Sequence, residues 1–197
     1  MKQQVIIIHG GSSFDSYKKF LDDLKNQEVT IESFLPKKDW KIHLQSELGG
    51  EFQVLAPRMP NSNNARYEEW KIWFKRMFPF MESEPILIGH SQGGIFLVKY
   101  LSENEFPKKI KALFLVAPPH SETHEISDFV FKKSLEGVEK QCPIIHLYQS
   151  KDDPIVPFNE VERYKKDLPS VKAHIFEDRQ HFNQEHFPEI VEEIKNL

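Results

Sequence analysis

One stretch of the chain decides the fold class: Ile86-Leu87-Ile88-Gly89-His90-Ser91-Gln92-Gly93-Gly94-Ile95-Phe96-Leu97-Val98. A short apolar run ends in a turn of glycines and polar residues, and a helix-like apolar run follows, which predicts a strand, a sharp turn and a helix. The turn has the form Gly-x-Ser-x-Gly, in which the glycines avoid collisions with the neighbouring strand and helix. Such a turn presents Ser91 as a nucleophile, whereas the alternative is an ordinary turn with Ser91 as helix N-cap.

Short apolar runs alternate with longer amphipathic stretches on either side of this turn, the pattern of a parallel sheet covered by helices. The expected strands are Val5–Ile8, Phe52–Ala56, Ile86–Gly89, Ala112–Ala117, Ile144–Tyr148 and Lys172–Phe176. The expected helices are Ser16–Lys25, Asp39–Leu48, Ala65–Phe78, Gln92–Glu103, Phe158–Asp167 and Phe187–Lys195. We therefore expect an α/β fold, a compact three-layer sandwich with about six mostly parallel strands, in one domain spanning residues 1–197.

Bulk composition excludes several classes of partner. The formal net charge is -4, and the lysine pairs are scattered among acids, so no basic stripe for nucleic acid is expected. The apolar run Val5–Ile8 is too short for a signal peptide or membrane span. The single cysteine, Cys142, fits a reducing compartment. We therefore expect a cytoplasmic protein with no membrane insertion, and the sequence leaves its oligomeric state open.

An acid is expected downstream of the serine, because the chain order in hydrolases with this turn is nucleophile, acid, histidine. The predicted strand Ile144–Tyr148 runs into a loop that contains Asp152 and Asp153. Asp153 heads a D-x-x-V-P pattern that ends at Pro157, which favours it as the partner of an imidazole. Asp152 remains the alternative, with a role in shaping the loop, and both aspartates are also consistent with a plain turn.

The base is expected on the loop after the last predicted strand, where Gln180-His181-Phe182 stands. A lone loop histidine is usually a surface residue. Here the ends of three predicted strands lead to Ser91, Asp153 and His181, and the carboxyl ends of parallel strands meet at one edge of the sheet. The sequence therefore predicts a Ser-Asp-His triad on an α/β-hydrolase fold.

Acyl transfer also needs two backbone amides that bind the oxyanion. Gln92, directly after the nucleophile, is expected to supply one. The loop that follows the first strand, His9-Gly10-Gly11-Ser12-Ser13, is expected to supply the other from Gly11 or Ser12. The loop lacks the patterns of a phosphate-binding loop, and a simple turn is the alternative.

No cofactor is expected, and no metal. Short metal-binding motifs such as H-E-x-x-H are absent from the sequence, and the histidines away from the predicted triad are spread over separate predicted elements.

These features resemble the small α/β-hydrolases related to the retinoblastoma-binding serine hydrolase. The likeness runs over nearly the whole chain, through Ile6–Gly11, Ala56-Pro57-Arg58-Met59-Pro60, Ile86–Gly94, Ser150–Pro157 and Gln180-His181-Phe182. The resemblance implies the same triad, no cofactor, and activity on small ester-like molecules.

The chain departs from the family pattern in two places. Gln180 stands where a glycine normally precedes the catalytic histidine, so a different loop shape is expected there. The segment Asn26–Leu48 looks longer than the compact family core, and the sequence does not say what it does.

The leading hypothesis is an esterase-type serine hydrolase that acts on a small-molecule substrate through an acyl-serine. One alternative is a binding protein on a hydrolase scaffold with vestigial activity. Another is an amidase or aminopeptidase that uses the same triad.

Overall fold

The structure is a computed structural model, and it describes the whole chain except residues 1, 37, 83, 122–125 and 133. The strands are β1 Gln3–Ile8, β2 Phe52–Leu55, β3 Ile86–His90, β4 Ala112–Val116, β5 Ile145–Ser150 and β6 Lys172–Phe176. The α-helices are α1 Tyr17–Asn26, α2 Trp40–Leu48, α3 Tyr67–Arg76, α4 Gln92–Glu103, α5 Glu136–Gln141, α6 Glu160–Asp167 and α7 Pro188–Lys195. Short 3-10 turns occupy Ile31–Phe34, Ser62–Asn64, Phe78–Phe80 and Ser127–Phe129.

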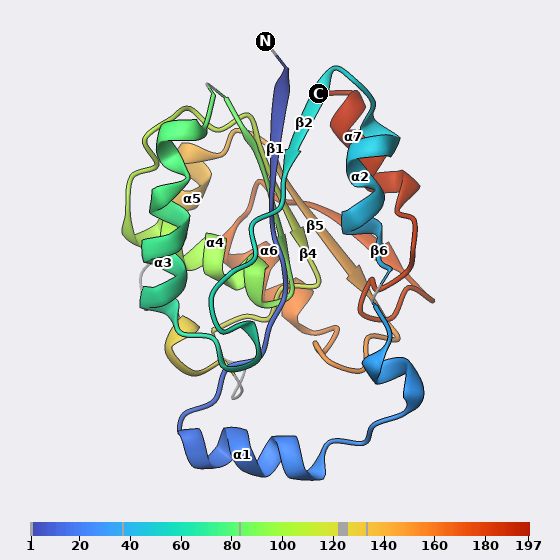
Figure 1. The fold of residues 1–197 in the computed structure, drawn as a ribbon. Helices are drawn as coiled ribbons and strands as arrows, with labels where there is room; N and C mark the ends of the chain where they lie inside the picture. Colours follow the sequence, from blue (N-terminus) through green and yellow to red (C-terminus); the bar gives the residue numbers. More distant parts are fainter. Residues whose placement is uncertain (1, 37, 83, 122–125, 133) are drawn as a thin grey trace.

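The strands form one six-stranded sheet in the order β2-β1-β3-β4-β5-β6, and every neighbouring pair is parallel. All strands therefore end at the same edge, at the bottom of the view in Figure 1. The strand order changes direction beside β1, and in open parallel sheets ligands bind beyond the carboxyl ends at such a point.

Alternate residues of the strands enter two separate cores. Ile6, Leu87 and Leu113 pack with α3, α4, α5 and α6, whereas Val5, Ile86 and Phe114 pack with α2 and α7. This follows from the two-residue period of a strand, which sends successive side chains to opposite faces. The result is the predicted three-layer sandwich (Figure 1).

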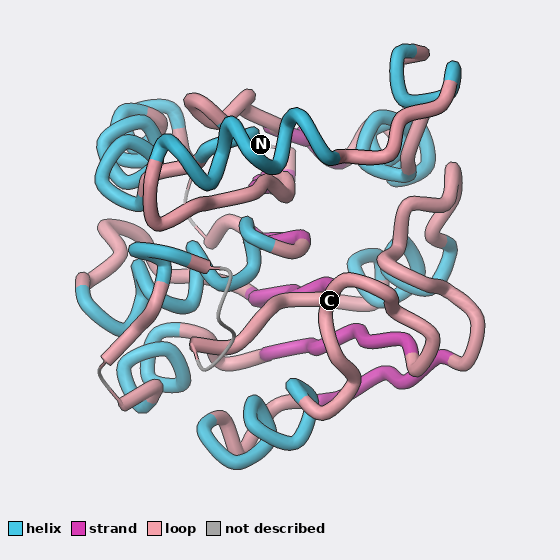
Figure 2. Tube along the Cα trace, turned by 90° about the horizontal axis from the view of Figure 1, so that it is seen from below, coloured by secondary structure: helices cyan, strands magenta, loops and turns pink. Residues whose placement is uncertain are grey.

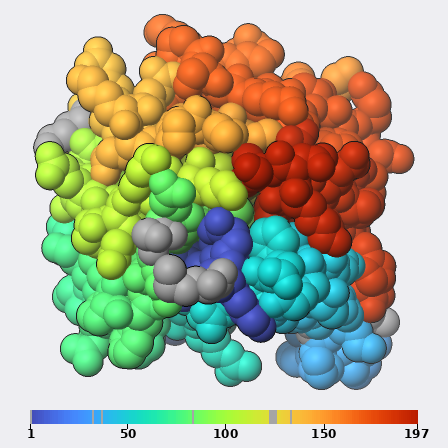
Figure 3. Space-filling model, turned by 90° about the horizontal axis from the view of Figure 1, so that it is seen from above, coloured from blue at the N-terminus to red at the C-terminus, as the bar shows by residue number. Residues whose placement is uncertain are grey.

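Helix α1 belongs to neither layer. It lies across the carboxyl edge of the sheet, and none of its residues is buried (Figures 1 and 2). The view from the opposite end shows the segment around α2 and β2, in cyan, beside α7, in red (Figure 3). Among the described residues, no helix has both the length and the apolar character needed to cross a membrane.

The predicted elements are confirmed, and their ends differ from the expected ones by two residues at most. Strand β1 begins earlier than expected, at Gln3, and β5 continues to Ser150. The segment between β4 and β5, to which the sequence analysis assigned no strand or helix, contains the turn Ser127–Phe129 and the short helix α5.

Helix α4 packs so closely against the end of β1 and against Pro118 that only glycine fits at positions 93 and 94. A Cβ atom on Gly93 would lie 2.1 Å from the carbonyl oxygen of Ile8, and one on Gly94 would lie 2.8 Å from the Pro118 Cβ. A distance of 2.1 Å to a backbone atom cannot be relieved by a side-chain rotation. A Cβ atom on Gly89 would likewise lie 2.5 Å from the Gly93 carbonyl oxygen, so both glycines of the Gly-x-Ser-x-Gly turn are required by packing between β1, β3 and α4.

We expect Gly93→Ala to lower the free energy of unfolding by about 3 kcal/mol, because the methyl group forces α4 away from β1. Gly50→Ala is the matched control, since no atom lies within 4 Å of a Cβ built on Gly50. Urea unfolding of both variants measures the difference. Equal stability of the two variants would contradict this packing argument.

Candidate active site

Ser91 occupies the turn between β3 and α4 with a backbone that most residues avoid. Its φ is 53° and its ψ is -122°, outside the conformations that L-residues ordinarily adopt. The amide of Ser91 donates to the Val116 carbonyl at 2.8 Å, which fixes the turn to the end of β4. The side chain is held at the start of α4, where the free amides and the helix dipole favour negative charge.

A cavity of about 500 Å³ opens beside Ser91. Its walls come from helix α1, from the start of α4 and from the loops after β1, β4 and β5. The lining residues include Gly11, Ser12, Ser13, Phe14, Lys19, Asp22, Asp23, Ser91, Gln92, Pro119, Ile126, Ile155 and Val156. Gly10 lies against the serine, because a Cβ built on it would be 3.2 Å from the Ser91 Cβ and 3.7 Å from its Oγ. The predicted nucleophile therefore faces a space of small-molecule size.

The loop after β1 is held by hydrogen bonds at Ser12 and Ser13. The Ser12 amide donates to the Ser62 carbonyl at 2.8 Å, and the Gln92 side chain donates to the Ser13 hydroxyl at 3.2 Å. The Ser12 amide is thus already engaged, so the structure argues against Ser12 as the second oxyanion donor. Gly11 and Gln92 remain, and in the described part of the chain no hydrogen bond donated by either backbone amide is found.

His9 stabilises this loop from behind, a role that the sequence analysis did not assign. The Met59 amide donates to His9 Nε2 at 2.8 Å, so the ring proton must sit on Nδ1, which donates to the Gly10 carbonyl at 2.6 Å. Met59, in the stretch Ala56–Pro60 that carries part of the family resemblance, thus orients His9, and the neighbouring Pro60 carbonyl accepts from the Trp70 indole at 2.8 Å.

Asp153 and His181 are in direct contact. His181 Nδ1 lies 2.8 Å from Asp153 Oδ2 and 3.1 Å from Oδ1. The aspartate side chain is fully buried, and the amides of Ile155 and Val156 donate to its Oδ1 at 2.8 and 3.0 Å. These bonds orient the carboxylate, which explains the spacing of the D-x-x-V pattern. Such a contact fixes the tautomer of the imidazole and leaves Nε2 to act as a base.

Asp152 has a different position and shapes the histidine loop. Its Oδ1 accepts from the Ser150 hydroxyl at 2.5 Å and from the Gln180 amide at 2.8 Å. These hydrogen bonds, the one from Ser150 foremost, lower the pKa of the Asp152 carboxyl. Gln180 has a φ of 47°, the left-handed conformation that a glycine adopts most readily, so the bond to Asp152 helps hold a strained residue directly before His181.

His90 supports the backbone of the His181 loop, whereas Asp153 contacts the imidazole. Its Nε2 lies 2.9 Å from the His181 carbonyl oxygen, and the Lys41 ammonium lies 3.3 Å from its Nδ1. An ammonium only donates, so Nδ1 accepts and Nε2–H donates to the carbonyl. Burial, and then the charge of Lys41, lower the pKa of His90 well below its ordinary value. His90 is therefore neutral, and its ring lies 5.0 Å from that of His181 between centroids.

Helix α2 supplies further contacts to the same loop. The Trp40 indole donates to the Phe182 carbonyl at 2.9 Å, and the Trp40 amide donates to the Gln184 carbonyl at 2.9 Å. Phe182 also has a positive φ, 52°. The helix in the segment that looked like an addition to the family core therefore anchors the loop that carries His181.

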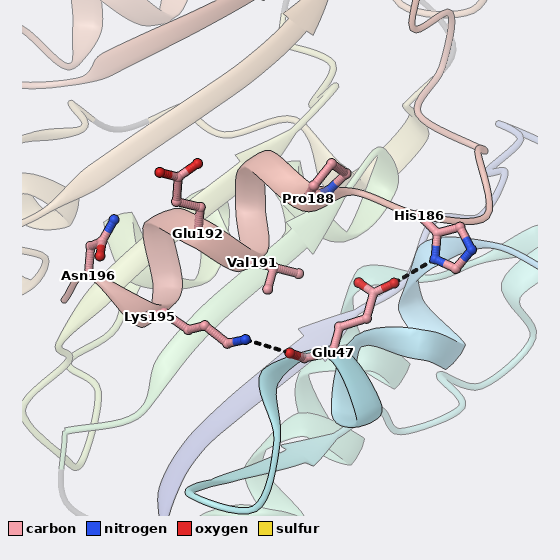
Figure 4. Close-up of a pocket in the computed structure, with 7 residues that line it drawn as sticks. All are labelled: Glu47, His186, Pro188, Val191, Glu192, Lys195 and Asn196. Atoms are coloured by element: carbon pink, nitrogen blue, oxygen red, sulfur yellow. Dashed lines mark hydrogen bonds and ion pairs between the residues drawn. The ribbon is translucent and has the colours of Figure 1, made fainter.

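A second cavity, between α2 and α7, contains none of the predicted site residues. Figure 4 shows Glu47 of α2 reaching His186 and Lys195, with 2.6 Å from its Oε1 to His186 Nδ1 and 2.7 Å from its carbonyl to the Lys195 ammonium. Among its seven lining residues there is no serine, threonine or cysteine. The contacts of Glu47 at this cavity join α2 to α7 and to the residue His186 that precedes α7.

The described residues contain one group of metal-ligating side chains, formed by His146, His174 and Glu193. No metal was expected from the sequence, because the sequence contains no short metal-binding motif. The sheet nevertheless brings these three residues together from β5, β6 and α7.

Comparison with known proteins identifies the family. The model of the family described as serine hydrolase matches residues 35–194. The chain belongs to the serine hydrolase family. It is 31% identical over 157 residues to serine hydrolase RBBP9 of Rattus norvegicus, an alignment that covers 74% of this chain and 78% of that protein.

Solved structures agree on the α/β-hydrolase fold. The ydeN gene product of B. subtilis matches with a TM-score of 0.73 at 18% identity, over 99% of this chain and 98% of that one. A mutant of the meta-cleavage product hydrolase CumD matches with a TM-score of 0.66 at 13% identity, over 100% of this chain and 92% of that one. At such low identity these likenesses concern the fold.

We expect Trp40→Phe to lower the free energy of unfolding by about 1–3 kcal/mol, because the Phe182 carbonyl loses its donor in a buried place. Ile42→Ala is the control in the same helix, since Ile42 is 60% exposed and its truncation should change stability by about 0.5 kcal/mol or less. Hydrogen exchange should also show faster exchange around residues 182–184 in Trp40→Phe alone. Unchanged exchange there would mean that α2 does not anchor the loop.

We expect the neutral state of His90 to make the protein less stable in acid. The folded pKa is depressed, so below about pH 6.5 the unfolded chain binds a proton that the folded chain does not, and stability falls as pH falls. One such group lowers the free energy of unfolding by at most about 1.4 kcal/mol per pH unit. His90→Gln cannot titrate, so its loss of stability between about pH 7 and pH 5, measured by urea unfolding, should be smaller. Identical losses in both proteins would contradict the assignment.

Proposed function

We propose that this serine hydrolase cleaves small ester-type substrates through a covalent acyl-serine, with Ser91 as nucleophile, His181 as base and Asp153 as the acid that holds His181. The observation that carries the proposal is the buried Asp153–His181 contact, at 2.8 Å, at the edge of the sheet where β3 delivers Ser91. His90, the residue before Ser91, supports this arrangement, because its neutral ring donates a hydrogen bond to the backbone carbonyl of His181.

In the first half of the reaction, His181 Nε2 takes the proton of the Ser91 hydroxyl as Oγ attacks the ester carbonyl carbon. The carbonyl oxygen becomes an oxyanion, to which the amides of Gln92 and Gly11 donate. The intermediate then collapses: the bond to the alcohol oxygen breaks, and this oxygen receives the proton from His181. The acyl group stays on Ser91.

In the second half, His181 takes a proton from a water molecule, whose oxygen attacks the acyl carbon. The second oxyanion collapses, the bond to Ser91 Oγ breaks, and Oγ regains the proton from His181. The carboxylic acid leaves. Asp153 keeps its charge throughout and stabilises the imidazolium that forms twice in the cycle.

The size and lining of the cavity favour a substrate with a short acyl group. Phe14, Ile126, Ile155 and Val156 give it apolar walls, and its volume of about 500 Å³ lies at the small end for ligand pockets. Helix α1 forms one wall and exposes most of its surface, so the substrate enters beside a single helix instead of beneath a separate domain.

Cys142 is not the nucleophile in this proposal. It is free and buried, and burial raises the pKa of its thiol to about 12, so that the reactive thiolate is rare at neutral pH. A free cysteine also favours a reducing compartment, and we propose the cytoplasm.

We expect a fluorophosphonate probe to label the wild-type protein and to fail with Ser91→Ala, because only an activated serine reacts. Ser170→Ala, at an exposed position before β6, is the matched control and should be labelled like the wild type. A wild type that resists labelling would favour the binding-protein alternative, and labelled Ser91→Ala would place the nucleophile elsewhere. Parallel assays with p-nitrophenyl esters and aminoacyl anilides separate ester from amide cleavage.

We expect Asp153→Asn to lower kcat on a p-nitrophenyl ester by about 10³- to 10⁴-fold, because the amide favours the wrong imidazole tautomer. Asp152→Asn should lower it by about tenfold or less, since its side-chain oxygen can still accept from Gln180. Steady-state kinetics of both variants gives the comparison. A larger loss in Asp152→Asn would reverse the assignment of the acid.

A further inference from the structure

His146, His174 and Glu193 form a cluster on the face of the sheet that is covered by α2 and α7. His146 is the second residue of β5, His174 lies in the middle of β6, and Glu193 belongs to α7. The cluster shares no residue with the cavity beside Ser91. Its chemistry is therefore separate from the proposed triad.

The donor atoms of the cluster have nearly the spacing that a tetrahedral metal requires. His146 Nδ1 lies 2.9 Å from His174 Nε2, and each of these nitrogens lies 3.9 Å from an oxygen of Glu193. Zinc bonds of about 2.0–2.1 Å in tetrahedral geometry place ligand atoms about 3.3 Å apart. The observed distances lie on either side of this value, so side-chain movements of a few tenths of an ångström suffice.

The two imidazoles are held in this orientation by aromatic neighbours. The His146 ring stacks on Phe114 with centroids 4.6 Å apart and an angle of 9°, and the His174 ring stacks on Tyr148 at 4.4 Å and 5°. The side chains of His146 and His174 are 4% and 17% exposed. Ligands that are fixed before the metal arrives lose little conformational freedom on binding.

We propose that His146, His174 and Glu193 bind a divalent transition metal of the zinc type, with water as the fourth ligand. Two imidazoles and one carboxylate suit Zn²⁺ and its neighbours, whereas Ca²⁺ and Mg²⁺ prefer sets of oxygen ligands. The metal joins β5, β6 and α7, and α7 follows the loop that carries His181. Bound metal therefore stabilises the folded chain at a place remote from the substrate.

Lys172 competes with the metal for the carboxylate. Its ammonium donates to Glu193 Oε1 at 2.8 Å, while Oε2 is the oxygen nearer to His146. The Lys172 side chain is 60% exposed, so it can turn into solvent when a cation replaces it. Removal of the lysine should strengthen metal binding.

The test is calorimetric titration of the chelator-treated protein with Zn²⁺, for the wild type and four variants. His174→Phe keeps an aromatic ring beside Tyr148 and Glu193→Gln keeps the side-chain size, so both preserve the packing. We expect one zinc per wild-type chain, an affinity lower by about tenfold or more in both variants, and a tighter site in Lys172→Ala. His186→Ala is the control, because it removes a histidine that contacts His43 and is not part of the cluster, and it should bind zinc like the wild type.

The melting temperature gives a second readout. Zinc should raise it in the wild type, in Lys172→Ala and in His186→Ala, but not in His174→Phe or Glu193→Gln. The proposal is overturned if the wild type binds no zinc at micromolar concentrations, or if the site survives in His174→Phe and Glu193→Gln and disappears in His186→Ala. Neither result bears on the activity of Ser91.

Discussion

The strained backbone at Ser91 is the constraint on which the rest of the structure depends. A positive φ at a residue with a side chain costs of order 1–3 kcal/mol, and it persists only where the surroundings enforce it. Here the Val116 carbonyl holds the Ser91 amide, and Gly93 brings α4 against the backbone of β1. The same contact sets the distance between the start of α4 and the loop after β1. The places of Ser91, the proposed nucleophile, and of the proposed oxyanion donors are thus consequences of one packing arrangement.

The histidine loop shows how a second strained segment is stabilised from several directions. Gln180 and Phe182 both have positive φ values, and the residue between them is the proposed base. Asp152 holds the loop from the side of β5, and His90 and Trp40 hold it from β3 and α2. These hydrogen bonds fix the backbone on both sides of His181. The His181 imidazole is therefore oriented before substrate binds, as general base catalysis requires.

Most of the fold could be predicted from patterns of residues that are close in sequence. The alternation of apolar runs predicted all six strands, and the Gly-x-Ser-x-Gly turn predicted the strand–turn–helix segment at Ser91, because both depend on residues close in sequence. The contacts of His90, Lys41 and Trp40 could not be predicted, since they join residues brought together only by folding. The hydrogen bond from the Ser12 amide to the distant Ser62 carbonyl, which bears on the choice between Gly11 and Ser12 as oxyanion donor, could not be predicted for the same reason. His146, His174 and Glu193 likewise come from three separate elements, so no motif could indicate them.

The most direct test of the account is a rapid-mixing measurement of p-nitrophenol release from p-nitrophenyl acetate, followed by mass spectrometry of the quenched protein. An acyl-serine mechanism in which hydrolysis of the intermediate is slower than its formation predicts a burst of about one nitrophenol per chain and an acetyl group on the peptide that contains Ser91. An acetyl group on a different residue during turnover, or turnover with Ser91 unmodified at every quench time, would contradict the central claim.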